Sequence, residues 1–526
     1  GNHFETIICP EKESAVLDDH SLVRYLLNIN PNLIAGTVYL WNIERFLRIA
    51  NMLKEAKEDL QIIAGGPEIA HNHPFIFANQ TLDAAVEGEG ESVFPFLAEN
   101  LLKNKAKKWY SNIFLRRKNN FLWGTSPPPP VHLPKVLPPA KSAENKPDSN
   151  GMAYLETSRG CPLQCAFCCY SQQRKKLSFL DPKDIINRTM ILKERGAKEI
   201  RFIDPTFNSH PAFEEIIAKI VSINKSGNIS FFAEIRADTI TPTQAKLLKK
   251  ANFTDLEVGV QSINPTVLSA IRRSTNIDSL KKGINNLVSN KLHLTVDIMC
   301  GLPFQTLTDI KSSLNWAYTI PNADVQFLHT LLLPGTALRT HSNELDLKAQ
   351  ELPPYRVTAT STLSEEDILT AEVYARQKAG RELDCPTSRF VGTNLPDLFP
   401  ERVTVPLQNI ASELSGNTNR RALIFSGSNL FSKRHIINTW INLALKKEPH
   451  ILWEFVINPS NEEPLDLLDL MIREIRKHPL TWLDRMSPDP FSRAVSRRIF
   501  ILLEKDKKYA KSWIKAADTL LSDTFY

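Results

Sequence analysis

The stretch that decides the fold runs from Leu155 to Tyr170 and reads LETSRGCPLQCAFCCY. Cys161, Cys165 and Cys168 have the spacing CxxxCxxC, in a loop behind an apolar run, Met152–Glu156, that predicts a strand. Thiolates this close together can converge on one metal centre, and thiolate is the usual ligand of iron–sulfur clusters. Three ligands are one short of a four-iron cluster or a structural zinc, and an open metal position is typical of catalysis.

Two other interpretations of these cysteines stay open. They could form a zinc knuckle that a distant histidine completes, or they could be inert buried thiols. No CxxC or HxxxH pair elsewhere in the chain offers zinc a partner. We therefore expect an iron–sulfur cluster.

The spacing, with the aromatic Phe167 directly before the third cysteine, resembles the radical S-adenosylmethionine (radical SAM) enzymes. The resemblance implies that Cys161, Cys165 and Cys168 hold a [4Fe–4S] cluster and that the amino and carboxylate groups of SAM bind its open iron. One-electron reduction, by an external flavodoxin- or ferredoxin-type partner, would then cleave SAM to a 5′-deoxyadenosyl radical. Phe167 would lie near the adenine, and Cys169 has no role in the pattern.

Residues 151–363 have the clearest pattern in the chain. Five further apolar runs predict strands, at Glu199–Ile203, Ile229–Ile235, Asp255–Val260, Leu292–Ile298 and Val325–Leu333. Helix-sized segments separate them, so we expect a partial TIM-like barrel of six strands, the radical SAM domain. Sites in such barrels lie at the carboxyl ends of the strands.

Polar residues follow three of these strands and suit the groups of SAM. They are Asp204, Thr206, Glu234, Arg236, Gln261 and Ser262. Arg236 offers the carboxylate of SAM a bidentate partner, and Glu234 or Asp204 offers the ammonium an acceptor. Gln261 and Ser262 suit the ribose hydroxyls. Each residue alone could instead be a helix cap or belong to a surface ion pair.

The first 125 residues alternate strands and helices, which predicts a parallel, doubly wound sheet. The expected strands are Phe4–Cys9, Leu33–Leu40, Gln61–Ala64 and Ala84–Val86. Helices are expected at Ile43–Lys57 and Ser92–Leu102, and a hairpin at Trp109–Trp123 closes the domain. Glycines after the strands let a ligand approach the backbone closely.

Three groups of residues in this region resemble the cobalamin-binding domain that precedes many radical SAM enzymes. They are Tyr39, Trp41 and Asn42; Gly65, Gly66, Pro67 and Glu68; and Glu87, Gly88, Glu89 and Gly90. The resemblance implies that they line the corrin. The DxHxxG signature, which supplies a histidine to cobalt, is absent, because Asp18, Asp19 and His20 are followed by no glycine at the required place. We therefore expect a lower cobalt face without a histidine.

The rest of the chain consists of a linker and a C-terminal domain. Residues 126–150 are rich in proline and predict a semi-rigid linker. Ser364 and Asp367 predict a capping box at the start of residues 364–526, a small α/β or α+β domain of unknown role. Strands are expected there at Arg421–Phe425, Ile451–Ile457 and Ile499–Leu503, with a helix at Lys433–Lys446.

Composition limits the functional classes. The net charge of +6 is spread over 526 residues, so it does not point to nucleic acid. No apolar run reaches the roughly 18 residues of a membrane span, and seven unevenly placed cysteines argue against a disulfide framework. We expect a cytoplasmic protein that binds neither membrane nor nucleic acid.

The combined resemblance implies a cobalamin-dependent radical SAM enzyme. Such enzymes mostly transfer a methyl group from methylcobalamin to an unactivated carbon, here of a small-molecule or peptide precursor. Cyclisation or rearrangement, and a non-enzymatic cobalamin or redox sensor, remain alternatives. A methylthiotransferase of tRNA or ribosomal protein is disfavoured, because the N-terminal region has only Cys9 for a second cluster. No catalytic residue is assigned.

Overall fold

The computed structural model describes residues 4–523, except 74, 77, 104–108, 118–119, 130, 132, 134–136, 138–140, 143–144, 173–176, 380–389, 396–399, 408–413, 415, 480–481 and 483–498. The chain divides into two compact units. Unit 1 comprises Gly1–Ile34, Leu40–Ile62 and Asp384–Tyr526, and unit 2 comprises Ala35–Tyr39 and Ile63–Leu383. Ten of the 25 residues of the predicted linker, 126–150, lie outside the described residues.

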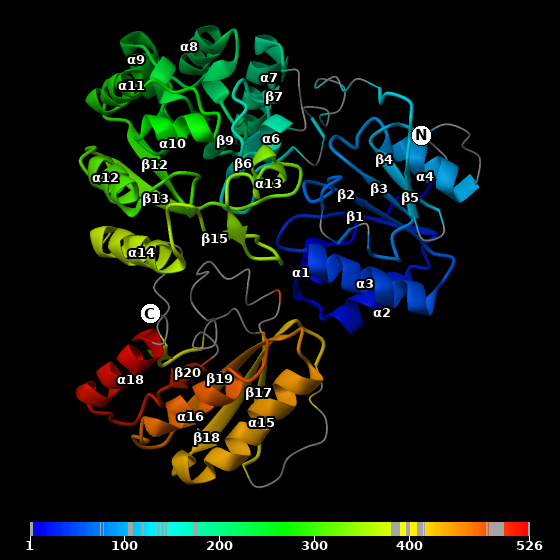
Figure 1. The fold of residues 1–526 in the computed structure, drawn as a ribbon, viewed down its shortest axis with the longest axis vertical. Helices are drawn as coiled ribbons and strands as arrows, with labels where there is room; N and C mark the ends of the chain where they lie inside the picture. Colours follow the sequence, from blue (N-terminus) through cyan, green and yellow to red (C-terminus); the bar gives the residue numbers. More distant parts are fainter. Residues whose placement is uncertain are drawn as a thin grey trace. The chain divides into compact units, whose positions relative to one another are not determined.

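Unit 2 contains a sheet of six parallel strands in the order β13-β12-β11-β10-β9-β6 (Figure 1). The strands are β6 Met152–Leu155, β9 Glu199–Phe202, β10 Ser230–Ile235, β11 Phe253–Gln261, β12 His293–Cys300 and β13 Ala323–His329. The connecting helices are α7 Pro182–Glu194, α8 Phe213–Ile223, α9 Pro242–Lys250, α10 Pro265–Ala270, α11 Ile277–Ser289 and α12 Leu307–Ala317. The prediction of a six-stranded partial barrel is confirmed.

Local chemistry explains where these helices begin. Asp181 accepts a hydrogen bond from Lys183 N, with Pro182 in the first turn of α7. Thr241 and Thr306 form reciprocal capping boxes with Gln244 and Asp309. Each cap satisfies backbone donors that have no partner within the helix.

Side chains alternate between the two faces of each strand. Phe202, Phe231 and Phe253 are almost fully buried and stack with one another and with Phe207. The intervening residues, such as Arg201, Phe232 and Glu234, are less buried and lie on the opposite face. With the helices covering the aromatic face, this second face forms the inside of the barrel.

A second sheet has the order β1-β2-β3-β4-β5. Its strands are β1 Leu33–Thr37, β2 Gln61–Gly65, β3 Ala84–Val86, β4 Ile113–Arg117 and β5 Asn120–Trp123. Strands β2 and β3 are parallel, whereas the predicted hairpin β4–β5 adds two antiparallel strands. The associated helices are α1 Glu11–Val16, α2 Asp19–Asn28, α3 Ile43–Ala56 and α4 Phe94–Lys103.

One predicted strand of this region is wrong. Residues Phe4–Cys9 form no strand, and nearly all of them are exposed, Ile8 at 81%. An apolar run without a neighbouring strand to pair with gains neither burial nor a hydrogen-bond ladder.

Unit 1 also holds a parallel sheet in the order β16-β20-β19-β18-β17. Its strands are β16 Val391–Gly392, β17 Glu401–Thr404, β18 Arg420–Gly427, β19 Leu452–Pro459 and β20 Ile499–Leu502, and its helices are α15 Arg434–Lys447, α16 Asp466–Ile475 and α18 Lys511–Asp523. Leu423, Phe455 and Trp440 belong to the apolar core between sheet and helices. This confirms the predicted C-terminal α/β fold.

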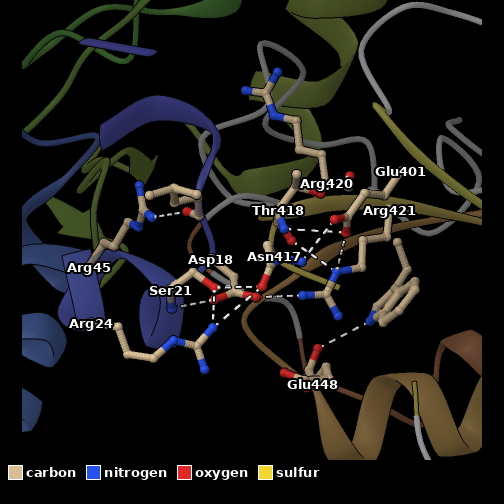
Figure 2. Close-up of polar contacts among 12 residues, drawn as sticks. Asp18, Ser21, Arg24, Arg45, Glu401, Asn417, Thr418, Arg420, Arg421 and Glu448 are labelled. Atoms are coloured by element: carbon tan, nitrogen blue, oxygen red, sulfur yellow. Dashed lines mark hydrogen bonds and ion pairs between the residues drawn. The ribbon is translucent and has the colours of Figure 1, made fainter. Parts of the chain in front are cut away.

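The C-terminal sheet binds the first residues of the chain within unit 1 (Figure 2). Leu17 forms an antiparallel bridge with Thr418, and Asp18 N donates to Asn417 O at 2.8 Å. The carboxylate of Asp18 accepts from Arg421 Nη2 at 2.5 Å, and Arg421 Nε lies 2.9 Å from Glu401. The Arg421 side chain is 2% exposed, so this is a buried ion pair between distant parts of the sequence.

Helix α14, Glu365–Ala379, moves the predicted boundary between the radical SAM domain and the C-terminal domain, which was placed at residue 364. Ser364 and Asp367 form the predicted cap, but α14 packs on α12 in unit 2 and does not open the C-terminal domain. Short elements complete the unit: β7 Ser158–Arg159, α6 Cys169–Gln172, β8 Ser178–Phe179, α13 Ala337–Thr340, β14 Lys348–Ala349 and β15 Val357–Ala359. None of the described helices has the length and apolarity needed to cross a membrane.

Candidate cofactor sites

The cysteine loop is attached to the barrel directly after its second cysteine, through both backbone groups of Ala166. Ala166 N donates to Ile271 O at 2.9 Å, and Leu338 N donates to Ala166 O at 2.7 Å. Cys165 is buried, whereas Cys161 and Cys168 are half-buried. Phe167 packs against Met299 and Leu302 in the core below the loop. These contacts hold the loop over the carboxyl end of the barrel.

Asp204 fastens the start of the same loop. Its carboxylate accepts from Thr157 N and Oγ1, both at 3.0 Å, and from Ser158 N and Oγ. Burial raises the pKa of Asp204 to about 6, against these hydrogen bonds. The expectation that Asp204 accepts from the ammonium of SAM therefore needs correction, because its acceptor sites already have partners.

Two polar side chains contact the cysteine sulfurs. Thr206 Oγ1 lies 3.4 Å from Cys161 Sγ, and Arg273 Nη1 donates to Cys165 Sγ at 3.6 Å. Burial raises the pKa of the Cys165 thiol, and the charge of Arg273 opposes that rise. A positive charge here stabilises a thiolate, the form that binds iron.

Arg273 was missed in the sequence. Arg273 follows helix α10 and does not stand at the end of a strand, so the rule that sites lie at the carboxyl ends of barrel strands does not identify it. No local signal could have identified it.

The donor set fits a four-iron cluster by its chemistry. Cys161, Cys165 and Cys168 are cysteines in the thiol form on one loop, and thiolates are the usual ligands of iron–sulfur clusters. Three thiolates leave one iron of such a cluster open for another ligand.

The remaining predicted SAM residues have diverse surroundings. Arg236 forms a bidentate pair with Asp238, at 3.1 and 2.5 Å. Ser262 is fully buried and accepts from Asn264 N, so the structure gives it a local role in place of the expected ribose contact. Gln261 has a φ of +70° and lies at the end of β11. Burial, then Glu257 and Asp204, raise the pKa of Glu234 to about 7.

A cavity of about 740 Å³ in unit 2 brings the predicted cobalamin loops together. Tyr39, Pro67 and Glu89 line it, together with six glycines: Gly36, Gly65, Gly66, Gly88, Gly90 and Gly160. A Cβ at Gly65, Gly88 or Gly90 would meet no atom within 4 Å, so these positions leave open space. At Gly66 a Cβ would lie 2.6 Å from Val38 O, with φ at +111°, so only glycine fits. A broad cavity with a bare backbone wall fits a large flat ligand such as a corrin.

Four other predicted cobalamin contacts do not line this cavity. Trp41 and Asn42 belong to unit 1, where Trp41 is 52% exposed and Asn42 precedes α3. Glu87 lies 3.5 Å from His71. Glu68 is 2% exposed and bonds to His73 at 3.1 Å and to Tyr355 at 2.9 Å. Glu68 and Glu87 thus belong to the predicted loops by sequence, but their side chains point away from the cavity.

The cavity wall also contains residues beside the cluster cysteines. Glu156, Arg159, Gly160, Cys169 and Tyr170 all line it. Arg159 donates to Glu156 at 2.6 Å and to Glu89 at 3.1 Å, and so joins the cysteine loop to the glycine loop. Sequence reasoning missed this link, because the partners lie 70 residues apart. No histidine is among the lining residues that the structure describes.

Comparison with known proteins agrees with this division of sites. The model of the radical SAM superfamily matches residues 155–317, and that of the B12 binding domain matches residues 2–98. The uncharacterized methyltransferase PH0819 of Pyrococcus horikoshii is 26% identical over 60% of this chain and 70% of its own. The cobalamin-dependent radical SAM methyltransferase TokK of Streptomyces tokunonensis is 22% identical over 59% of this chain, which spans about half (48%) of that protein.

A solved structure shares the fold. The radical SAM methyltransferase TsrM of Kitasatospora setae, with cobalamin and a [4Fe–4S] cluster bound, superposes with a TM-score of 0.53 at 14% identity, over 63% of this chain and 69% of that one. The radical SAM match assigns SAM and a [4Fe–4S] cluster to this chain, and the B12 match assigns cobalamin. The chain therefore carries a B12-binding domain ahead of a radical SAM domain.

Proposed function

We propose that this enzyme is a methyltransferase that acts on an unactivated carbon of a small-molecule or peptide precursor. One observation carries the proposal: the glycine-lined cavity and the cysteine loop share a wall. Gly160 and Cys169, which line the cavity, are the direct neighbours of Cys161 and Cys168. Cofactors at the two sites would therefore lie on either side of one loop.

The chain's own residues would hold and orient these cofactors. Cys161, Cys165 and Cys168 would bind three irons, with Arg273 next to Cys165. Gly65, Gly66, Gly88 and Gly90 would let the corrin approach the backbone. When bound, methylcobalamin supplies the methyl group and SAM supplies the radical that removes the substrate hydrogen.

Two arginines fit a SAM contact best: Arg236, which was predicted, and Arg273, which was missed in the sequence. Arg236 and Arg273 are the cations that interact with the cysteines, since the charges of Cys161 and Cys165 help to raise the pKa of Arg236, after its bond with Asp238. Either could receive the carboxylate of SAM next to the open iron. Phe167 and Gln261 stay proposed contacts of adenine and ribose.

The test is an anaerobic spectrum, with iron and cobalt analysis, of protein produced with cobalamin supplied. Four irons and one cobalt per chain, with methyl transfer to a substrate, would support the proposal. Cys165→Ala should lose the cluster and keep cobalamin. Protein that binds no oxygen-sensitive cluster, or that keeps the cluster in Cys165→Ala, would contradict it.

The lining residues also support a lower cobalt face without a protein histidine. The Co(II) form should then show an electron paramagnetic resonance (EPR) spectrum without nitrogen splitting from an axial ligand. Nitrogen splitting in the spectrum of the wild type would contradict this expectation. Loss of the splitting in a His71 or His73 variant would identify that histidine as the axial ligand, and splitting that survives in both variants would come from another group.

A further inference from the structure

A buried hydrogen-bond network joins the loop after β2 to the residues that follow the barrel strands. Glu68 comes directly after Pro67 of the cavity wall, accepts from Tyr355 Oη at 2.9 Å and lies 3.1 Å from His73 Nε2. All three side chains of the network are buried, and Tyr355 is completely so. Glu68 and Tyr355 are 287 residues apart, so the network connects two distant segments of unit 2.

Backbone donors determine the tautomer of His73. Its Nδ1 accepts from Ile76 N at 3.1 Å and from Phe75 N at 3.3 Å, so the ring proton is on Nε2 and faces Glu68. Burial lowers the pKa of His73, although its bond with Glu68 opposes that effect, and a neutral ring fits these contacts. Glu68 Oε2 therefore accepts two hydrogen bonds, one from His73 and one from Tyr355.

Tyr355 is held firmly on the barrel side of the network. Leu332 N donates to Tyr355 O at 2.9 Å, and the guanidinium of Arg339 lies 4.8 Å from the centre of the phenol ring. Tyr355 has a φ of +59°, a conformation that a bulky residue adopts only where its surroundings impose it. The position of its hydroxyl group is therefore defined by the end of the barrel.

The cysteine loop rests on the same buried cluster as Tyr355. That cluster also contains Leu338 and Ala166, and Phe167 packs against it. Leu338 N donates to Ala166 O, and Ala166 directly follows Cys165. The residues that hold Tyr355 therefore also hold the cysteine loop.

Asn72 forms a second connection between the same two segments. Its Oδ1 accepts from Gly335 N at 2.7 Å, and its Nδ2 donates to Thr340 Oγ1 at 3.3 Å. A Cβ on Gly335 would lie 3.2 Å from the Cβ of Ala70, so the two backbones approach each other closely. Residues 68–73 are thus attached at two places to the residues after β13.

The chemistry of the network suits precise placement better than stability alone. Apolar side chains of similar volume are often as stabilising as buried charged or polar groups. A fully satisfied buried network, in contrast, makes one relative position of its parts more favourable than the others. Here the parts are the wall of the cobalamin cavity, through Pro67 and Glu68, and the support of the cysteine loop, through Tyr355.

We propose that Glu68, His73 and Tyr355 are positioning residues that set the distance between cobalamin and the iron–sulfur cluster. The inference rests on the two cofactor sites of the proposed function and adds the residues that fix their separation. Both cofactors act on one substrate, and a displacement of about 1 Å can reduce a rate about 100-fold. None of the three residues needs to touch a cofactor for this role.

The test is an EPR measurement on the anaerobic holoenzyme with SAM bound, reduced so that Co(II) and the cluster are both paramagnetic. The dipolar interaction between the two centres falls steeply with distance and splits the Co(II) signal. Tyr355→Phe removes only the hydroxyl group that donates to Glu68, and Glu68→Leu removes the acceptor of both bonds. Each variant should lose the wild-type splitting and keep its full iron content.

Two variants serve as controls. Glu68→Gln keeps an oxygen that accepts from Tyr355 and His73, so it should keep the splitting. Tyr374→Phe is the matched control, since Tyr374 Oη donates to Asn315 at 2.6 Å on the surface of α14 in unit 2. It should also leave the splitting unchanged.

The wild-type splitting in Tyr355→Phe would overturn the proposal even if the protein became less stable, because the network would then serve only the fold. Loss of both metals in Tyr355→Phe, or an equal change in Tyr374→Phe, would overturn it as well. Tyr355→Phe decides the test if Glu68→Leu does not fold. Wild-type protein that lacks cobalt, iron or any dipolar interaction would instead contradict the proposed function, and the inference with it.

Discussion

Arg273 is the residue whose charge most directly affects the cysteine loop. Its Nη1 donates to Cys165 Sγ, and its Nη2 donates to Gly259 O, at the end of β11. Hydrogen bonds and positive charge at a cluster sulfur stabilise the reduced state of an iron–sulfur cluster. Arg273 is therefore a positioning residue that also tunes the cluster.

Arg273→Met should lower the reduction potential of the cluster, because it removes the positive charge beside Cys165. Turnover should fall about 10- to 100-fold, the usual effect of losing a partner of a metal ligand. A redox titration followed by EPR measures the potential. Arg201→Met is the control, since Arg201 lies over Phe232 and pairs with Glu199, away from the cysteines. An unchanged potential in Arg273→Met would show that its contact is only structural.

The carboxylates in the barrel predict an unusual pH dependence of stability. Burial, then Glu257 and Glu234, raise the pKa of Asp297 to about 8, so between pH 4 and 8 the folded chain binds more protons than the unfolded chain. Stability should fall as pH rises through this window. Asp297→Asn removes the titrating group and should raise the free energy of unfolding at pH 8 by about 1–3 kcal/mol, with little gain at pH 4.

Denaturant unfolding of the cofactor-free protein at both pH values measures this change. Asp309→Asn provides a control of opposite sign. Burial acts to raise the pKa of Asp309, but bonds from Thr306 and Asn264 lower it below its usual value. That variant should lose stability at pH 8. A loss in Asp297→Asn at pH 8 would refute the argument.

At the scale of single residues, the sequence predicted which residues stand at the ends of the barrel strands but not where their side chains point. The rule that sites lie at strand ends led to Asp204 and Ser262 as expected SAM contacts. Both turned out to hold the backbone, Asp204 through Thr157 and Ser158, and Ser262 through Asn264. Which way a side chain turns depends on packing around it, and no local pattern records that.

At the scale of elements, the loops after β1, β2 and β3 form the wall of the cobalamin cavity. Glycine at these places provides space as well as flexibility. Gly65 has no neighbour within 4 Å of a Cβ position and no left-handed φ, so a larger residue there would enter the cavity without strain.

Gly65→Leu should therefore abolish cobalamin binding and leave the fold and the cluster intact. We expect at least about a 100-fold loss of affinity, because the side chain would occupy the space of the ligand. Cobalt content and iron content of reconstituted protein measure the two effects. Ala218→Leu, which adds a side chain of the same kind on the exposed side of α8, should change neither. Full cobalt occupancy in Gly65→Leu would place the cofactor elsewhere.

The six barrel strands were predicted to within four residues at either end, because their apolar runs are clear in the sequence. Phe4–Cys9 failed because a strand is defined by its neighbour, and its composition shows only that it could pair. Helix α14 was predicted correctly as a helix, but its partner α12 could not be read from local sequence.

At the scale of the molecule, unit 1 depends on contacts between the two ends of the chain. The ion pair of Asp18 and Arg421 is buried and lies beside Glu401 (Figure 2). The backbone bridge between Leu17 and Thr418 supports it. Breaking a buried ion pair leaves one charge without compensation.

Arg421→Met should lower the stability of unit 1 by about 3–5 kcal/mol, because it leaves Asp18 and Glu401 without their cation. Asp18→Asn should cost less, because Arg421 keeps its ion pair with Glu401. The double variant should be less unstable than the sum, which a double-mutant cycle by denaturant unfolding measures. Arg24→Ala, whose partners are Ser21 and Asn417 at the exposed edge, should change stability by about 0.5 kcal/mol or less. If the losses of stability in the two single variants add up to the loss in the double variant, Asp18 and Arg421 do not stabilise each other.

The contact between Asp18 and Arg421 also determines when unit 1 can finish folding during synthesis. Asp18 and Arg421 are 403 residues apart, and ribosomes add about 5–20 residues per second. The first helices must therefore wait about 20–80 s for the sheet that completes them, while the barrel can fold in between. During that interval the nascent chain exposes the surface of these helices that the C-terminal sheet later covers, and a chaperone could bind there.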